Sequence, residues 1–166
     1  SFNKIYELQP DNLQLGFLKL LKGTIVRDDA ARYGYEFRKQ APYEVISNKY
    51  MSSLDIIKLK MIETVLELFY NRGGFFYTLP QLEDMVSRTS FNFYEQLADF
   101  YYSNGYQHKS HKKEDLYRIL LKFAESRESR FPGVTLATKE NLIADLDETM
   151  NMDAVKKFNN KGWVIE

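Results

Sequence analysis

From residue 52 onward, apolar residues recur at the three- and four-residue spacing of amphipathic helices. The first such pattern predicts a helix from Ser52 to about Asn71, ended by Gly73-Gly74. Ser52 and Asp55 have the spacing of a capping box. The expected buried stripe consists of Leu54, Ile57, Met61, Ile62, Val65, Leu68 and Phe69, and it is widened by Ile56, Leu59, Leu66 and Tyr70. We therefore expect other structure to cover this helix on most sides.

Shorter helical patterns follow, and turn residues separate them. The predicted ranges are 78–86, 90–104, 112–126 and 138–150, with a last candidate turn of helix at 153–158 before Trp163-Val164-Ile165. Thr78 and Gln81 have the form of a second capping box, and Thr138 is expected to cap the last long helix. Short loops between successive helices favour antiparallel neighbours in a bundle.

The N-terminal third carries no clean helical pattern. Residues 11–22 fit a helix capped by Asp11, because Leu13 and Phe17 fall on one helical face, but alternating apolar residues in the same run fit a strand. Gly16 weakens both interpretations. The choice between helix and strand stays open for this run.

After that run, local signals become clearer. A short helix is predicted over residues 27–33 and closed by Gly34, and short strands are predicted at residues 35–37 and 43–46 on either side of Ala41-Pro42. We therefore expect a mainly α fold. It would be a bundle of about five helices with a short β-hairpin or strand remnant in the N-terminal third.

The length of 166 residues suits one domain with an appendage, divided by pattern into residues 1–51 and 52–166. Lysine plus arginine and aspartate plus glutamate both number 23, so the formal charge is zero. That balance argues against an electrostatically driven nucleic-acid binder. No apolar run approaches the roughly 18 residues of a membrane span, no signal peptide is visible, and we expect a cytoplasmic protein.

Cysteine is absent, which excludes disulfides, thiol nucleophiles and metal or cluster sites with cysteine ligands carried by this chain. Aromatic residues make up 15% of the chain. Their spacing at 75–77 and 91–102 fits helix packing, so a core built on large rings is the first expectation. A docking face for another domain is the alternative.

Two polar clusters could carry chemistry. His108 and His111 have an i, i+3 spacing that could share a metal, but the stretch is predicted as a loop and shows no third ligand. Lys109, Lys112 and Lys113 make a small basic cluster that could hold phosphate. Acidic residues follow these lysines at once, as at an ordinary helix start.

A third cluster is acidic. Asp145, Asp147 and Glu148 gather on the last long helix, and the i, i+3 pair Asp145 and Glu148 could bind a hard cation. Without a second element that carries carboxylates, a solvated face is the favoured interpretation. No catalytic motif is complete: glycine-rich phosphate loops and G-x-S-x-G are both absent.

Several segments, in order, resemble the end of the core of cobalamin-binding radical-SAM proteins. They are Leu13-Gln14-Leu15-Gly16-Phe17-Leu18-Lys19-Leu20-Leu21-Lys22-Gly23-Thr24, Ala30-Ala31-Arg32-Tyr33-Gly34-Tyr35 and Ala41-Pro42-Tyr43-Glu44-Val45-Ile46. In that family a barrel strand leads into an LxGT turn, and an A-x-x-x-G segment and a PPYEV stretch follow; here Ala41 replaces a proline. Residues 54–71 and Phe91-Asn92-Phe93-Tyr94-Glu95 resemble an uncharacterised C-terminal domain that follows this core.

The resemblance implies a non-catalytic accessory domain that caps or flanks the barrel of a cobalamin-dependent radical-SAM enzyme, an oxidoreductase-like iron–sulfur protein. The four-iron four-sulfur cluster, S-adenosylmethionine and cobalamin would belong to the parent protein, because the C-x-x-x-C-x-x-C motif is absent here. Gly23 and Thr24 would lie at the mouth of the barrel, where they could line a cofactor pocket. The partners would be the N-terminal catalytic domains of the same chain.

A different class of function also fits the residues: a stand-alone helical module that docks a protein or RNA through its aromatic face. A further expectation concerns residues 8–22. A barrel strand without its sheet must find other partners for its backbone groups. We expect this run to form a local helix or hairpin, or to pair with a second copy of the chain.

Overall fold

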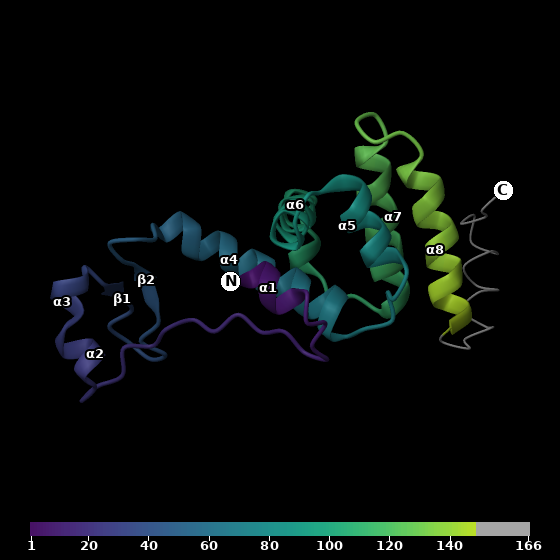
Figure 1. Ribbon diagram of the computed structural model, residues 1–166. Coiled ribbons are helices and arrows are strands. Elements are labelled where there is room, and N and C mark those ends of the chain that lie inside the picture. The colour runs from purple at the N-terminus through teal and green to yellow at the C-terminus, as the bar shows by residue number, and fades with distance from the viewer. Residues whose placement is uncertain (149–166) are drawn as a thin grey trace. The chain divides into compact units, whose positions relative to one another are not determined.

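The computed structural model describes residues 1–148 and is mainly α-helical, with one small antiparallel sheet in its N-terminal part, as predicted (Figure 1). Met150, the predicted turn at 153–158 and the apolar residues 163–165 lie outside the described residues. Contacts divide the chain into two compact units. We call residues 14–63 the hairpin unit, and residues 1–13 together with those from 64 onward the helical unit. The first 51 residues are thus shared between both units.

The hairpin unit begins with two short helices, α2 (Ile25–Asp28) and α3 (Ala30–Tyr33). Gly34 ends α3 in the left-handed conformation at φ 62°, which glycine adopts without steric cost, as predicted. Strands β1 (Glu36–Phe37) and β2 (Val45–Ser47) then pair antiparallel. The predicted hairpin is confirmed.

Residues 12–22 form neither a helix nor a regular strand, so the helix capped by Asp11 is wrong. The run is extended and makes one antiparallel bridge, Lys19 with Glu44. The N–H of Leu20 donates to the carbonyl of Tyr43 at 2.8 Å, and the N–H of Val45 donates to the carbonyl of Leu18 at 2.9 Å. The backbone groups of this run thus find local partners beside the hairpin.

Helix α4 (Ser53–Val65) starts in the hairpin unit, and a π-helical turn (Leu66–Asn71) continues it. The capping box is confirmed, because Asp55 N–H donates to Ser52 Oγ at 3.2 Å and Ser52 N–H donates to Asp55 Oδ2 at 2.8 Å. The expectation of cover on most sides is wrong for the first turns, where Leu54 and Ile57 are 74% and 53% exposed. Within the hairpin unit, only the face that carries Ile56 meets a core, so the other apolar positions stay open.

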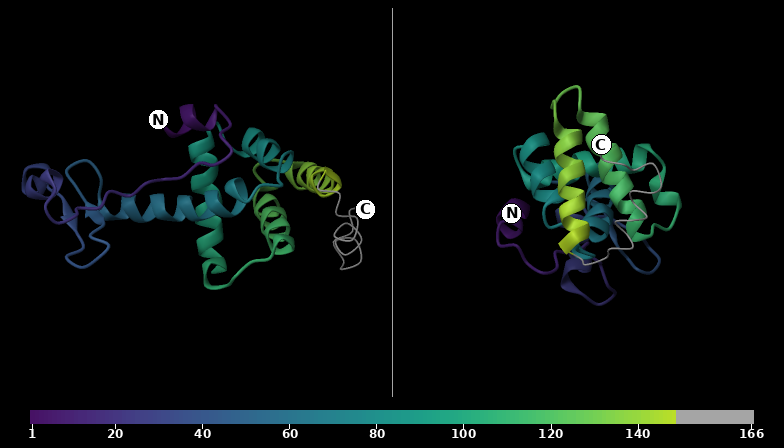
Figure 2. Two further views of the ribbon diagram at one scale, coloured as in Figure 1. Left: turned by 90° about the horizontal axis from the view of Figure 1, so that it is seen from below. Right: turned by 90° about the vertical axis from the view of Figure 1, so that its right-hand side faces the viewer.

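The helical unit contains α1 (Phe2–Tyr6), α5 (Thr78–Val86), α6 (Ser90–Ser103), a 3-10 turn (Tyr106–His108), α7 (Lys113–Arg127) and α8 (Val134–Glu148). Helix α8 packs on both α5 and α7, as the views in Figure 2 show. The predicted start of the last helix is wrong by one turn. Thr138 is buried inside α8 rather than capping it, because the helix already begins after Pro132-Gly133.

Aromatic side chains form the core of the helical unit, as the first expectation held. The buried rings are Tyr6, Phe69, Phe75, Phe93, Tyr94, Tyr101, Tyr117 and Phe123. Phe93 contacts Tyr94 and Phe123 edge to face, with ring centroids 5.2 and 6.1 Å apart. Helix α1, which the sequence did not predict, adds Tyr6 to this core, and the Tyr6 and Tyr94 hydroxyls lie 3.3 Å apart.

Candidate functional site

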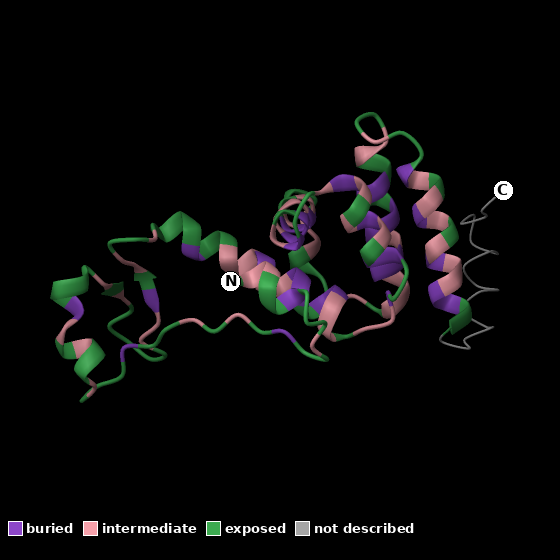
Figure 3. Cartoon of the chain, in the orientation of Figure 1, coloured by how far each residue is buried: buried purple, intermediate pink, exposed green. Residues whose placement is uncertain are grey.

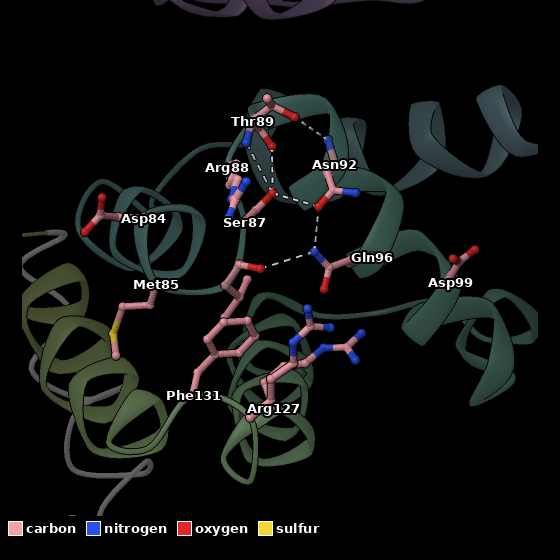
Figure 4. Close-up of a pocket in the computed structure, with 12 residues that line it drawn as sticks. Asp84, Met85, Ser87, Arg88, Thr89, Asn92, Gln96, Asp99, Arg127 and Phe131 are labelled. Atoms are coloured by element: carbon pink, nitrogen blue, oxygen red, sulfur yellow. Dashed lines mark hydrogen bonds between the residues drawn. The ribbon is translucent and has the colours of Figure 1, made fainter.

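A pocket of about 840 Å³ opens in the helical unit between the turn that joins α5 to α6 and the C-terminal end of α7 (Figure 4). Both charged and amide side chains line it, together with one aromatic ring. Its lining residues are Asp84, Met85, Val86, Ser87, Arg88, Thr89, Asn92, Gln96, Asp99, Arg127, Arg130 and Phe131. The volume lies in the range of about 300–1,000 Å³ that small-molecule sites occupy.

One wall of the pocket is a hydrogen-bonded turn. Thr89 caps α6, since its Oγ1 accepts from the N–H of Asn92 at 3.2 Å. Ser87 Oγ lies 3.0 Å from Asn92 Oδ1 and 2.9 Å from the Thr89 carbonyl. Gln96 Nε2 donates to Asn92 Oδ1 at 2.9 Å and to the Val86 carbonyl at 3.3 Å. These bonds hold the polar groups of the turn in place before any ligand arrives.

The opposite wall carries arginines. The Arg127 guanidinium lies 5.0 Å from the centre of the Phe123 ring, and its Nε is buried with no hydrogen-bond partner. Burial lowers the pKa of Arg127, and the nearby charge of Arg130 lowers it further, whereas Asp99 acts in the opposite direction. Among the described residues, no carboxylate lies within ion-pair distance of Arg88, Arg127 or Arg130. The pocket therefore has unused cationic donors on both walls, with Arg88 on the turn and Arg127 and Arg130 near the end of α7.

The three acidic residues near the end of α8 do not share one environment. Asp145 is fully buried, while Asp147 and Glu148 are exposed. Asp145 Oδ1 accepts from the N–H of Tyr77 at 2.8 Å. Its Oδ2 accepts from the N–H of Thr78 at 3.1 Å and from Thr78 Oγ1 at 2.5 Å. Asp145 therefore caps α5 from another helix, and the interpretation of a solvated face is wrong for it.

The same contact corrects the second capping box. Thr78 is the first residue of α5 rather than its cap, and its hydroxyl is committed to Asp145. Gln81 Oε1 accepts from the Thr138 hydroxyl at 3.2 Å instead of from the start of its own helix. Groups of three or more potential metal ligands are absent from the described part of the chain. The carboxylate of Asp145 thus serves to join α5 and α8.

The three lysines predicted as a basic cluster do not share one surface. Lys113 is half-buried, donates to the Gly73 carbonyl and lies 4.2 Å from the centre of the Phe75 ring. Burial lowers its pKa, while Asp145 opposes that shift. Lys109 and Lys112 are exposed. Lys113 therefore joins the packing around the glycine pair, and a three-lysine phosphate patch does not form.

The two histidines lie on different local structures. His108 ends the 3-10 turn and is exposed. His111 lies in the following loop, where its Nε2 is 2.8 Å from the Tyr106 carbonyl and its ring contacts Tyr101 edge to face. The i, i+3 spacing on a shared helix, on which the metal hypothesis rests, is therefore absent from the structure.

Gly23 and Thr24 form a turn in the hairpin unit. Gly23 has φ 79°, and a Cβ there would meet no atom of this chain within 4 Å, so the backbone conformation rather than close packing explains the glycine. Thr24 stands at the N-cap position of α2, but its hydroxyl donates to the Leu21 carbonyl at 2.8 Å. The two residues thus make a turn before α2.

Sequence reasoning missed the pocket. The available signal was weak: Arg127 and Arg130 are three residues apart at the end of a helix, and Arg88 precedes a helix cap. Nothing in the sequence states that these two segments meet. The meeting depends on how α5, α6 and α7 pack.

None of the described helices is long and apolar enough to cross a membrane. A search of the curated proteins finds no match, and a search of the solved structures also finds none. One protein family does match, over residues 31–164, and it is described as a protein of unknown function. The match begins inside α3 and leaves residues 1–30 outside it. Because it extends over most of the chain, the chain belongs to this family of proteins of unknown function, DUF4080.

Proposed function

We propose that the chain is a non-catalytic accessory region of a cobalamin-dependent radical-SAM enzyme, and that its hairpin unit packs against the catalytic barrel. The resemblance of residues 13–46 to the end of such a barrel supports this proposal. So does the extent of the family match, which leaves out residues 1–30 and thus the first half of the barrel-like segment.

The observation that carries the proposal is the exposed apolar surface of the hairpin unit. Its core is a small cluster of four buried hydrophobic residues, Leu20, Ala30, Val45 and Ile56, and Ile62 is buried at the end of the unit. Large apolar side chains stay exposed in the same unit: Leu18, Leu21, Ile25, Val26, Tyr33, Ile46, Tyr50, Leu54 and Ile57. Figure 3 shows exposed residues along α2, α3 and the start of α4. Small units with so much exposed apolar surface usually bind a partner.

The extended run beside the hairpin supplies a second argument. Leu18 and Leu20 direct backbone groups toward Tyr43 and Val45. Because hydrogen-bonding directions alternate along an extended chain, the backbone groups of Lys19 point the other way, whereas the Leu21 carbonyl is already bonded to Thr24. A strand from a barrel could pair with that side, as an unpaired edge allows.

In this proposal the iron–sulfur cluster, S-adenosylmethionine and cobalamin are held by other parts of the protein. The chain has no cysteine and therefore contributes no thiolate to a cluster. Gly23 and Thr24 form an exposed turn that could complete a pocket only together with residues from the barrel. We assign them no chemical step.

The reading frame upstream of Ser1 offers the first test. It should encode C-x-x-x-C-x-x-C about 200 residues earlier, a spacing taken from the usual size of a barrel. The full protein, reconstituted with iron and sulfide, should form 5′-deoxyadenosine from S-adenosylmethionine when dithionite supplies electrons. A full protein that holds no cluster and cleaves no S-adenosylmethionine would overturn the assignment and favour the stand-alone interaction module.

Hydrogen exchange tests where the barrel binds. The barrel region, expressed separately and added to this chain, should slow amide exchange in residues 14–63. Leu54→Gln combined with Ile57→Gln should weaken that binding and reduce self-association of the isolated chain in sedimentation experiments. Leu136→Gln is the matched control, because Leu136 is 55% exposed but lies in the helical unit. Protection confined to residues 64–148 would contradict docking through the hairpin unit.

A further inference from the structure

The pocket of the helical unit has a chemistry that the proposed accessory role does not use. We propose that this pocket binds a small organic phosphate, with Arg127 and Arg130 as the residues that hold the phosphate. The proposal is independent of any catalytic barrel, because every residue that lines the pocket belongs to the helical unit.

The side chain of Arg127 is the first argument. Its Nε is buried and has no hydrogen-bond partner, so the protein supplies no acceptor on that side of the guanidinium. The residue lines the pocket, and Figure 4 draws its side chain on the α7 side of that pocket. The terminal nitrogens of a guanidinium can donate to two oxygens of a phosphate group, which makes a tetrahedral oxyanion a suitable acceptor.

The second argument is uncompensated positive charge. Arg127 and Arg130 are close enough for the charge of one to affect the other, and no described carboxylate forms an ion pair with either. Two neighbouring guanidinium groups repel each other, and a bound anion removes that repulsion. Arg88 adds a third cation to the lining.

The acidic residues of the pocket narrow the class of ligand. Asp84 and Asp99 also line it, so three arginines stand against two aspartates and the lining carries a net charge of only +1. A long polyanion such as RNA would bring phosphates near these carboxylates, whereas a compact phosphate can bind beside the arginines alone. The zero net charge of the whole chain also disfavours RNA.

The rest of the pocket suits an organic group attached to the phosphate. Ser87, Asn92 and Gln96 present polar atoms that their mutual bonds hold in place. The ring of Phe131 offers an apolar face. The volume of about 840 Å³ leaves room for a group larger than inorganic phosphate. These features predict that the pocket recognises the organic group of the ligand as well as its phosphate charge.

Calorimetry on the full 166-residue chain with inorganic pyrophosphate tests the phosphate contact. We expect saturable binding to one site. Arg130→Gln should weaken it about tenfold, which is the usual size of one charge-assisted hydrogen bond. Arg127→Gln should weaken pyrophosphate binding at least as much. Arg127→Lys should bind more tightly than Arg127→Gln, because lysine keeps the positive charge, but less tightly than the unchanged chain, because lysine lacks the planar guanidinium. The control is Lys122→Gln, which removes an exposed charge from α7 outside the pocket.

Arg127 packs on Phe123, so its variants also remove a packing contact. Arg130 is exposed, and Arg130→Gln tests the proposal without that change in packing. Citrate, which has a similar charge at neutral pH, should bind at least tenfold more weakly than pyrophosphate. The proposal is overturned by equal binding of citrate, by an equal loss in Lys122→Gln, by no saturable binding of pyrophosphate at millimolar concentration, or by RNA binding that pyrophosphate does not displace.

Discussion

The two units of the chain bury apolar surface in very different ways. The helical unit encloses whole aromatic rings: Phe69, Phe93, Tyr94 and Phe123 have less than 2% of their surface exposed. In the hairpin unit the buried hydrophobic residues are the cluster of Leu20, Ala30, Val45 and Ile56 together with Ile62, and side chains as large as Tyr50 are 85% exposed. The difference shows that apolar residues serve a closed core in one unit and an open surface in the other.

Size and topology explain this contrast. Long helices joined by short loops bring several apolar stripes together, so each covers the next. Two short helices and a two-stranded hairpin offer too few faces to do so, and small units are hard to stabilise alone. We therefore expect the helical unit to resist perturbation as one cooperative structure, and the hairpin unit to depend on what covers it.

The largest predicted effect comes from opening the aromatic core. Phe93→Ala should lower the free energy of unfolding of the helical unit by about 3–5 kcal/mol, because the ring is fully buried and its loss leaves a cavity. Urea denaturation followed by circular dichroism measures this. Phe76→Ala is the control, since Phe76 is 62% exposed and should cost well under about 1 kcal/mol. Similar losses for both variants would mean that the core is not closed as described.

The next effect concerns the bond between α5 and α8. Asp145→Ala should destabilise the helical unit by about 2–4 kcal/mol, because it leaves the buried N–H of Thr78 and the partly buried N–H of Tyr77 without an acceptor. The exposed Asp147 provides the matched control: Asp147→Ala should change stability by no more than about 0.5 kcal/mol. If both variants unfold at the same urea concentration, Asp145 is not the cap of α5.

Alkaline pH should lower the stability of the helical unit, because its buried tyrosines titrate there. Burial raises the pKa of both Tyr6 and Tyr117 from 10.0 to about 12, and it raises the pKa of Tyr94 as well. The unfolded chain loses these protons near pH 10 while the folded helical unit keeps them. The contribution of Tyr6 and Tyr117 is complete below pH 10 and is lost as pH rises from 10 to about 12, at roughly 2 kcal/mol for each of these two after allowance for solvent screening, and Tyr94 acts in the same direction.

Denaturation curves at pH 8, 10 and 11 measure this dependence. The stability of the helical unit should fall over that series, and Tyr6→Phe should make the fall shallower because one titrating phenol is removed. A helical unit with equal stability at pH 8 and pH 11 would contradict the burial of these hydroxyls.

The smallest effect lies in the hairpin unit. Ser52→Ala removes the hydroxyl that accepts from Asp55 N–H and should cost about 1 kcal/mol. Faster amide exchange in the first turns of α4 would report the loss, while exchange in α6 and α7 stays unchanged. Ser53→Ala is the control, because Ser53 lies inside α4 and is exposed. Equal acceleration in both variants would show that Ser52 does not cap the helix.

Much of the fold follows from local sequence signals. Ser52 with Asp55, Gly34 and the hairpin around Ala41-Pro42 all act over a few residues, and each was predicted where it is found. The candidate site was not predictable to that extent. The pocket joins residues from 84–99 to residues from 127–131, and no local rule connects two segments so far apart in the sequence.

The sequence by itself determined the fold class, the hairpin and the approximate limits of most long helices, because spacing, caps and glycines act within one or two turns. Only the tertiary structure decided what those elements cover. In the folded chain Asp145 is buried and caps a helix distant in sequence, whereas Leu54 is exposed. Arg127 and Gln96 line the same pocket from different helices. Each outcome depends on which faces of separate elements meet, and packing rather than local preference determines that.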